Sequence, residues 1–197
     1  MEKKLPQVLA TIRRTKAVRG RPIRLMFQDE ARFGRMVRIR RCWAPRPLRP
    51  TVCNGYEREF LYVYGAVSPA QGEMDWMIAR QMNTQRMSEF LAQVSAAHPG
   101  EYIVMVVDGA SSHVAKGLLV PQNIRLLRLP PYAPELNPQE HVWDELREKE
   151  FPNRVYADLP SVQRQLEVGL PKLAAGHEAL RSLTAWPWIH KLILNAC

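Results

Sequence analysis

The feature that most restricts the fold is a short, continuously apolar run, Tyr102–Val107, which ends at Asp108 and Gly109. A run of this length bounded by turn residues is typical of a strand. When every side chain of a strand is apolar, both of its faces are buried, as in the middle of a partly parallel sheet. We therefore expect this run at the centre of a sheet, with Asp108 at its carboxyl end.

Other segments fit around this central strand. Ile23–Asp29 alternates in a pattern that predicts a strand with one more apolar face, and Arg38–Trp43 is its expected hairpin partner. Phe60–Val67 and Met74–Ala79 are expected to pair antiparallel. The remaining expected elements are a helix from Asn83 or Thr84 to about Ala97, a short helix capped by Ser111 or Ser112, a strand Ile124–Leu129, a helix with Asn137 as cap and Pro138 first that ends at Glu148 or Glu150, and helices Asp158–Ala174 and Trp188–Asn195.

The positive charge of the chain is concentrated near its start. Of the net +9 on 197 residues, the first 49 residues carry +12 and the rest carry −3. Such a basic region favours a polyanion, most commonly nucleic acid, although a solvated surface is the alternative. The residues expected to bind DNA are Arg13, Arg14, Lys16, Arg19, Arg21, Arg38, Arg40, Arg41, Trp43 and Arg46. Arginine matches phosphate geometry, and Trp43 either stacks on an unpaired base or packs in the hairpin.

Composition also excludes some classes of protein. No apolar run approaches the roughly 18 to 20 residues that span a bilayer, so no membrane partner is expected. The three cysteines form no CxxC pair, which fits a reduced, cytoplasmic environment better than a disulfide scaffold.

Three acids occupy unusual positions: Asp29 ends the first strand, Asp108 ends the apolar strand, and Glu140 lies near the start of a helix. Such positions can converge, because ligands gather at strand ends in sheets of this kind. Clustered carboxylates bind Mg²⁺ or Mn²⁺, and two such ions support phosphodiester chemistry. Taken singly, each acid has a commoner role as a turn or cap residue.

Three segments carry a resemblance to a known family. Phe27–Glu30 (FQDE), Val106–His113 (VVDGASSH) and Leu129–Trp143 (LPPYAPELNPQEHVW) closely resemble the catalytic blocks of DDE transposases. They look most like the bacterial insertion-sequence branch of the mariner-related superfamily. Arg41–Arg46 (RCWAPR) also matches a block of this branch, and the similarity covers about residues 22–155.

The resemblance implies an α/β, RNase H-like fold with a mixed five-stranded sheet flanked by helices. It implies that Asp29, Asp108 and Glu140 are catalytic and hold two Mg²⁺ or Mn²⁺ ions per active site. The implied reaction is DNA strand cleavage followed by 3′-OH strand transfer. The implied partners are element ends, target DNA and a second copy of the chain on DNA, in the bacterial cytoplasm at the nucleoid.

The chain departs from the family in two respects. Asp108 and Glu140 have 31 residues between them, slightly fewer than usual. Only about twenty residues precede the first expected strand, fewer than the family's N-terminal helix-turn-helix domains need, so we expect either a separate helix-turn-helix polypeptide or a truncated remnant. We expect residues 1–21 to form a basic arm, in which Leu5, Val8, Leu9 and Ile12 permit a short helix, 22–155 the catalytic domain, and 156–197 C-terminal helices packed on it. The alternative functions are a non-catalytic DNA-binding or accessory protein and a related structure-specific nuclease.

Several neighbours of the three acids are further candidates. His113, Asn137 and Asp144 are expected near the site, with an exposed ion pair the favoured interpretation for Asp144. Glu30 is expected to point to the strand face opposite to that of Asp29. Glu135 is the nearest rival to Glu140, whereas Trp143 is expected in the core.

Overall fold

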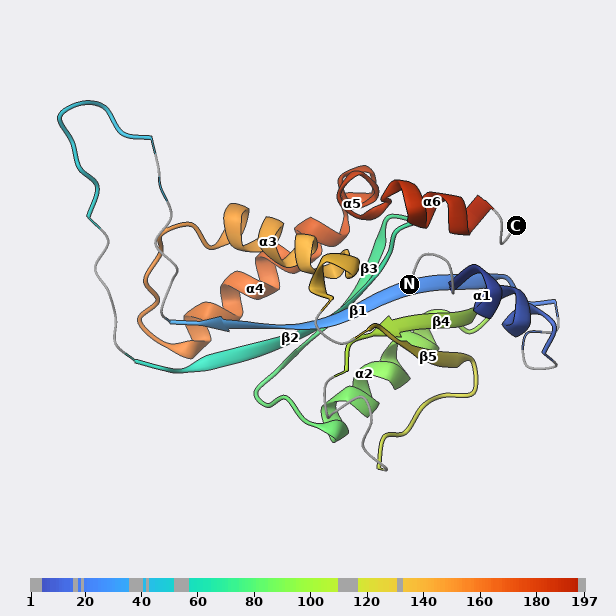
Figure 1. Ribbon diagram of the computed structural model, residues 1–197. Helices are drawn as coiled ribbons and strands as arrows, with labels where there is room; N and C mark the ends of the chain where they lie inside the picture. Colours follow the sequence, from blue (N-terminus) through green and yellow to red (C-terminus); the bar gives the residue numbers. More distant parts are fainter. Residues whose placement is uncertain are drawn as a thin grey trace.

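The chain folds around a mixed sheet with helices on both faces (Figure 1). The computed structural model describes residues 5–15, 18, 20–35, 41, 43–51, 57–109, 117–130 and 133–194. Within these residues the sheet has five strands in the order β3-β2-β1-β4-β5. The strands are β1 (Ile23–Gly34), β2 (Phe60–Ser68), β3 (Glu73–Ala79), β4 (Tyr102–Val107) and β5 (Ile124–Arg128). β1, β2 and β3 are antiparallel neighbours, whereas β4 and β5 run parallel to β1.

The helices divide between the two faces of the sheet. Helix α2 (Thr84–Ala97) packs its apolar side on one face, with Met87, Phe90, Leu91 and Val94 buried there. The other face is covered by α1 (Leu5–Arg13), α3 (Gln139–Glu150), α4 (Leu159–Ala174), α5 (His177–Thr184) and α6 (Pro187–Leu194). In the described part of the chain, no helix is both long and apolar enough to cross a bilayer.

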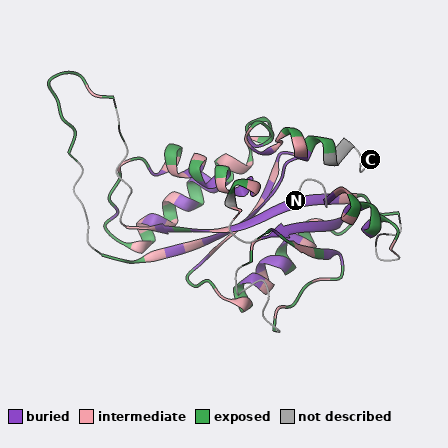
Figure 2. Ribbon diagram, in the orientation of Figure 1, coloured by how far each residue is buried: buried purple, intermediate pink, exposed green. Residues whose placement is uncertain are grey.

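Strand β4 lies inside the sheet, as its apolar sequence predicts. Val104 and Val106 belong to the core beneath α3, whereas Ile103, Met105 and Val107 belong to the core beneath α2. All six residues of the strand are buried, and β4 has a neighbour on each side (Figure 2). The expected burial of both faces of this strand inside the sheet is confirmed, although the central strand of the five is β1.

Strand β1 shows the expected alternation. Leu25 and Phe27 face the α3 side, and Met26 faces the α2 side. Asp29 therefore shares the face of Phe27, and Glu30 points to the opposite one.

The partner of β1 differs from the expected one. Gly34 pairs with Phe60, so the antiparallel neighbour is β2 and not Arg38–Trp43. Within that segment, Arg41 and Trp43 lie outside any strand, and 38–40 and 42 are outside the described residues. Three prolines follow in 44–50, and proline removes the N–H groups that a strand needs. The helix expected from Ser111 or Ser112 also falls outside the described residues.

The start of the chain packs on the domain. Leu5, Leu9 and Ile12 of α1 are buried in the same core as α3, so this part of the expected arm does not extend freely from the fold. Their spacing of three and four residues places these side chains on one side of the helix. Arg13, at the end of α1, remains on its exposed side.

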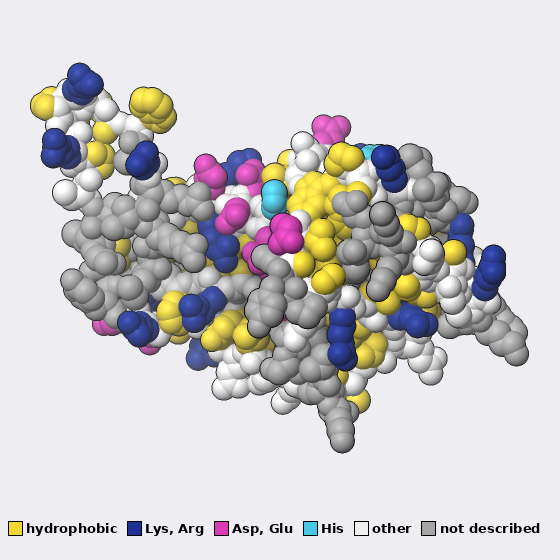
Figure 3. Space-filling view, in the orientation of Figure 1, with side chains coloured by type: hydrophobic (Ala, Val, Ile, Leu, Met, Phe, Trp, Pro, Cys, Tyr) yellow, Lys and Arg dark blue, Asp and Glu magenta, His cyan; other side chains and the backbone are white. Residues whose placement is uncertain are grey.

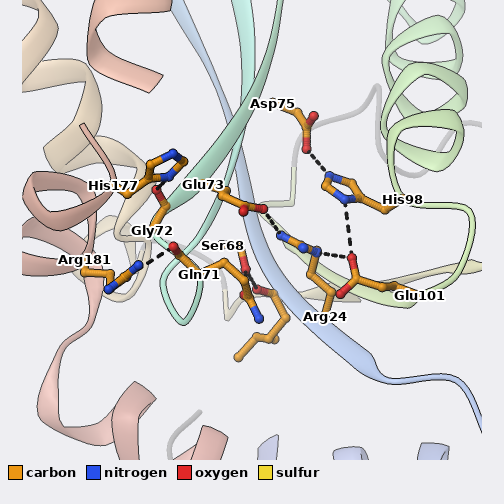
Figure 4. A network of polar contacts seen from close by, with 11 residues as sticks. Arg24, Ser68, Gln71, Gly72, Glu73, Asp75, His98, Glu101, His177 and Arg181 are labelled. Atoms are coloured by element: carbon orange, nitrogen blue, oxygen red, sulfur yellow. Dashed lines mark hydrogen bonds and ion pairs between the residues drawn. The ribbon is translucent and has the colours of Figure 1, made fainter. Parts of the chain in front are cut away.

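A polar network closes the amino-terminal end of β1, away from Asp29 (Figure 4). Arg24 is 7% exposed, and its guanidinium contacts Glu73 at 2.7 Å and Glu101 at 2.5 Å. His98 contacts Asp75 at 2.8 Å. The network joins β1, β3 and the connection between α2 and β4, and it neutralises a guanidinium that would be costly to bury alone.

Candidate active site

Two of the three predicted acids lie at the same end of neighbouring parallel strands. The last paired residues of β1 and β4 are Phe27 and Val106, and both contribute to the core on the α3 side. Asp29 and Asp108 each follow two residues later. Side chains two apart along a strand point to the same face, so this register directs both acids towards α3.

The third acid, Glu140, is brought to this face by α3. Trp143 lies one turn after Glu140 and is fully buried. Its indole N–H donates to Oδ2 of Asp29 at 3.1 Å. Residues three apart lie on the same side of a helix, so Glu140 also faces the end of the sheet. Figure 3 shows acidic side chains gathered over this part of the molecule.

The electrostatics of Asp29 reflect this convergence. Asp29 is 9% exposed, and its burial, followed by the negative charges of Glu140, Glu30 and Asp108, raises the pKa of its carboxyl group to about 8. A backbone hydrogen bond from Glu30 acts in the opposite direction. In the absence of a cation, Asp29 is therefore mostly protonated at neutral pH.

Asn137 fastens the start of α3 to the sheet. Its side-chain amide donates to the backbone carbonyl of Gln28 at 3.0 Å, and its Oδ1 accepts from the backbone N–H of Gln139 at 3.2 Å. The helix begins at Gln139, so Pro138 precedes it as the cap and Asn137 lies one residue further out than expected. Because Gln28 adjoins Asp29, Asn137 sets the distance between the helix start and the first acid.

Gly65 makes the close approach of α3 to the sheet possible. It pairs with Asp29 across β1 and β2. A Cβ atom at this position would lie 2.4 Å from Cη2 of Trp143 and 2.9 Å from the side-chain nitrogen of Gln139. The sequence does not point to Gly65 as a site residue, and it predicts Trp143 in the core without its bond to Asp29. Gly65 and Trp143 are 78 positions apart in the chain, so no local sequence pattern signals their contact.

Other candidates near the acids lie on the outer surface. Asp144 is exposed and its carboxylate is 3.5 Å from Arg147, which is the ion pair expected for it. Glu135 is also exposed, in a short 3₁₀ helix before α3. His141 is exposed and its ring lies 5.2 Å from that of Trp186. His113 is outside the described residues.

The expected DNA-binding residues fall into two regions. Arg13, Arg14 and Arg21 line a cavity of about 810 Å³ between α1 and the start of β1. Arg41, Trp43 and Arg46 are exposed on the long excursion between β1 and β2, which projects from the body in Figures 1 and 3. The indole of Trp43 is fully exposed, so it does not pack on a described strand. Lys16, Arg19, Arg38 and Arg40 lie outside the described residues.

The donor chemistry of the three acids fits a divalent cation. Carboxylate oxygens are the ligands that Mg²⁺ and Mn²⁺ prefer, and a cation would offset the mutual repulsion that acts on Asp29. Among the described residues, however, no three Asp, Glu, His or Cys side chains are assembled closely enough to form a ready-made metal site. The acids are thus near enough to influence one another electrostatically, and a bound cation would have to draw them closer.

The arrangement of strands and helices matches that of solved transposase structures. A Mos1 mariner paired-end complex with Mn aligns with 100% of this chain and 62% of that chain, with a TM-score of 0.61 and 15% identity. A pre-cleavage Mos1 transpososome aligns with 100% of this chain and 61% of that one, with a TM-score of 0.61 and 14% identity. The expected RNase H-like fold is therefore confirmed. The chain spans about three fifths of the length of these Mos1 chains.

The family is shown by sequence. Residues 24–163 match the DDE superfamily endonuclease family, and the chain belongs to this family. It is also 33% identical over 131 residues to the uncharacterized protein y4pE/y4sA of Sinorhizobium fredii, a match that covers 66% of this chain and 97% of that protein. The expected membership among DDE enzymes is confirmed.

Proposed function

We propose that this chain is the catalytic domain of a DNA transposase that cleaves DNA strands and joins their 3′-OH ends with the help of divalent cations. The observation that carries the proposal is the convergence of Asp29, Asp108 and Glu140 at one end of the sheet. Family membership in the DDE endonucleases supports the same reaction class. A buried carboxyl group whose pKa is raised by neighbouring acids is typical of a functional site, which supports the proposal.

Asp29, Asp108 and Glu140 are the residues that would hold two Mg²⁺ or Mn²⁺ ions. Such ions activate an attacking hydroxyl and neutralise charge on the leaving oxygen of a phosphodiester. The three acids would hold and orient the ions, and they would form no covalent bond to the DNA. A bound cation would favour the ionised form of Asp29, because its positive charge would offset the burial and the neighbouring acids that raise the pKa of this group. Trp143 is fully buried and donates its indole N–H to Asp29, so its ring shields that side of the carboxyl group from water.

The basic residues are proposed to hold the DNA. Arg13, Arg14 and Arg21 would contact phosphates beside α1, and Arg41 and Arg46 would do so on the projecting excursion. Trp43 is exposed and available for stacking on an unpaired base. His113, Asn137 and Asp144 remain candidates for residues that position the three acids. Of these, Asn137 has hydrogen bonds that join the start of α3 to the strand of Asp29.

Assembly on DNA is part of the proposal. The Mos1 structures include paired-end complexes, one of them with the left transposon end. By analogy we propose that two copies of this chain act together on element ends and target DNA. A helix-turn-helix on a separate polypeptide would supply recognition of the ends, and the complex would act at the bacterial nucleoid.

A second candidate is a non-catalytic DNA-binding or accessory protein. It is favoured by one observation, the absence of an assembled three-acid cluster among the described residues. Such a protein would bind DNA without Mg²⁺ and would tolerate replacement of all three acids.

The two candidates are separated by a cleavage assay. Purified chain is incubated with Mg²⁺ and labelled DNA fragments from either flank of its own gene, and nicked and joined products are measured. We expect Asp29→Asn, Asp108→Asn and Glu140→Gln each to abolish both products while DNA binding persists. Glu135→Gln is the matched control, since Glu135 is an exposed acid close to Glu140 in sequence, and it should retain activity. Products that survive all three substitutions would refute the catalytic proposal.

A further inference from the structure

We propose that Trp143 is a positioning residue, which holds the Asp29 carboxylate in the orientation that cation binding requires. This inference rests on the proposed function of Asp29 as a metal ligand. The bond between the indole N–H and Oδ2 of Asp29, at 3.1 Å, is its starting point.

The indole has a single polar atom, and Asp29 is its partner. Trp143 is 0% exposed, and an indole N–H can only donate. Turning the ring away would leave a buried donor without an acceptor, which is unfavourable. The burial of Trp143 therefore restrains the carboxylate as well as the ring.

The ring itself is confined on several sides. The rings of Trp143 and Phe33 of β1 form a T-shaped pair, with centroids 6.3 Å apart. Gly65 lies against the far edge of the indole, where any side chain would collide with it. Gly65 and Phe33 belong to the strand pair that carries Asp29, so one rigid unit fixes both partners of the hydrogen bond.

Such a bond has a defined effect on a metal ligand. A donor that holds one carboxylate oxygen limits rotation of the group, so less orientation has to be lost when a cation binds. Partners of this kind commonly contribute about 10-fold to 100-fold to metal affinity. The apolar part of the Trp143 ring meanwhile packs in the core, which is the role that its sequence position predicts.

The decisive variant removes the donor and keeps an aromatic ring. Trp143→Phe leaves an apolar side chain over Gly65 but no N–H for Asp29. Trp186→Phe is the matched control, because its indole N–H donates to the Leu183 carbonyl and not to a carboxylate. Gly65→Ala is a second variant, which displaces the indole from the strand side without altering Trp143.

Two quantities are measured on the full chain: Mn²⁺ affinity by calorimetry without DNA, and the Mg²⁺ dependence of strand cleavage. We expect Trp143→Phe and Gly65→Ala to weaken Mn²⁺ binding about 10-fold or more and to raise the half-saturating Mg²⁺ concentration by a similar factor. Cleavage at saturating Mg²⁺ should fall much less, and Trp186→Phe should match the wild type. A purely structural role would instead lower thermal stability and leave Mn²⁺ affinity unchanged, which would overturn the inference.

The outcomes also separate this inference from the function on which it rests. If the wild type binds Mn²⁺, Asp29→Asn does not, and Trp143→Phe binds as tightly as the wild type, only the positioning role is wrong. If Asp29→Asn binds Mn²⁺ as tightly as the wild type, Asp29 is no ligand, and both the proposed metal site and the role of Trp143 fall.

Discussion

Replacing Asp29 by asparagine should change how the stability of the metal-free protein depends on pH. Burial and the nearby acids raise the pKa of Asp29 from an ordinary value of 3.8 to about 8. Between these two values the folded protein keeps a proton on Asp29, whereas the unfolded chain has lost it. The unfolded state therefore binds fewer protons, and stability must fall as the pH rises through this window.

The magnitude follows from the number of protons involved. One proton contributes about 1.4 kcal/mol per pH unit, so Asp29 should destabilise the fold by about 3 kcal/mol more at pH 7 than at pH 5. The asparagine of the Asp29→Asn variant carries no charge at either pH and can still accept the indole N–H of Trp143. The variant should therefore gain about 3 kcal/mol relative to the wild type over this interval.

Urea unfolding in the presence of a chelator measures this difference at several pH values. Asp144→Asn is the control, because Asp144 is an exposed acid that forms an ion pair with a surface arginine. Its stability relative to the wild type should change little over the same range. If the difference between Asp29→Asn and the wild type is the same at pH 5 and pH 7, Asp29 is not the buried acid of raised pKa described above.

Three further predictions concern other parts of the molecule. Arg24→Met should lower the free energy of unfolding by about 2 to 3 kcal/mol, because Glu73 and Glu101 lose their cation, and an unchanged urea midpoint would show that this network is dispensable. Asn137→Ala should cost about 2 kcal/mol and slow cleavage, since two hydrogen bonds at the start of α3 are removed; unaltered unfolding and cleavage would remove it from the site. Replacing Arg13, Arg14 and Arg21 together by glutamine should reduce the salt dependence of DNA affinity, by about 0.9 in log–log slope for each phosphate that the protein no longer neutralises. An identical slope in filter binding would place the DNA elsewhere.

Much of the fold follows from local sequence patterns. The alternation in β1 predicts a strand, and the unbroken apolar run of β4 predicts burial on both faces, which all six of its residues show. Asn83 also caps α2 as expected, because its side chain accepts from the backbone N–H of Arg86 within the same turn. Such features depend on residues close together in the chain.

The remaining features depend on contacts between distant segments. The pairing of β1 with β2 spans residues 35–59, a connection too long for a local turn signal to set its register, and the sequence patterns do not predict α5. The bond between Trp143 and Asp29 joins residues 114 apart, and the space for it is left by Gly65. The three acids can therefore be predicted from the sequence, whereas the contacts that position them cannot.

The central claim, that Asp29, Asp108 and Glu140 hold divalent cations, is tested most directly by a crystal structure with Mn²⁺. Anomalous scattering locates manganese independently of the refined protein atoms. We predict manganese at the carboxyl ends of β1 and β4, coordinated by oxygens of Asp29 and Asp108 and approached by Glu140. Manganese bound only at other residues, in protein that still cleaves DNA, would contradict the claim.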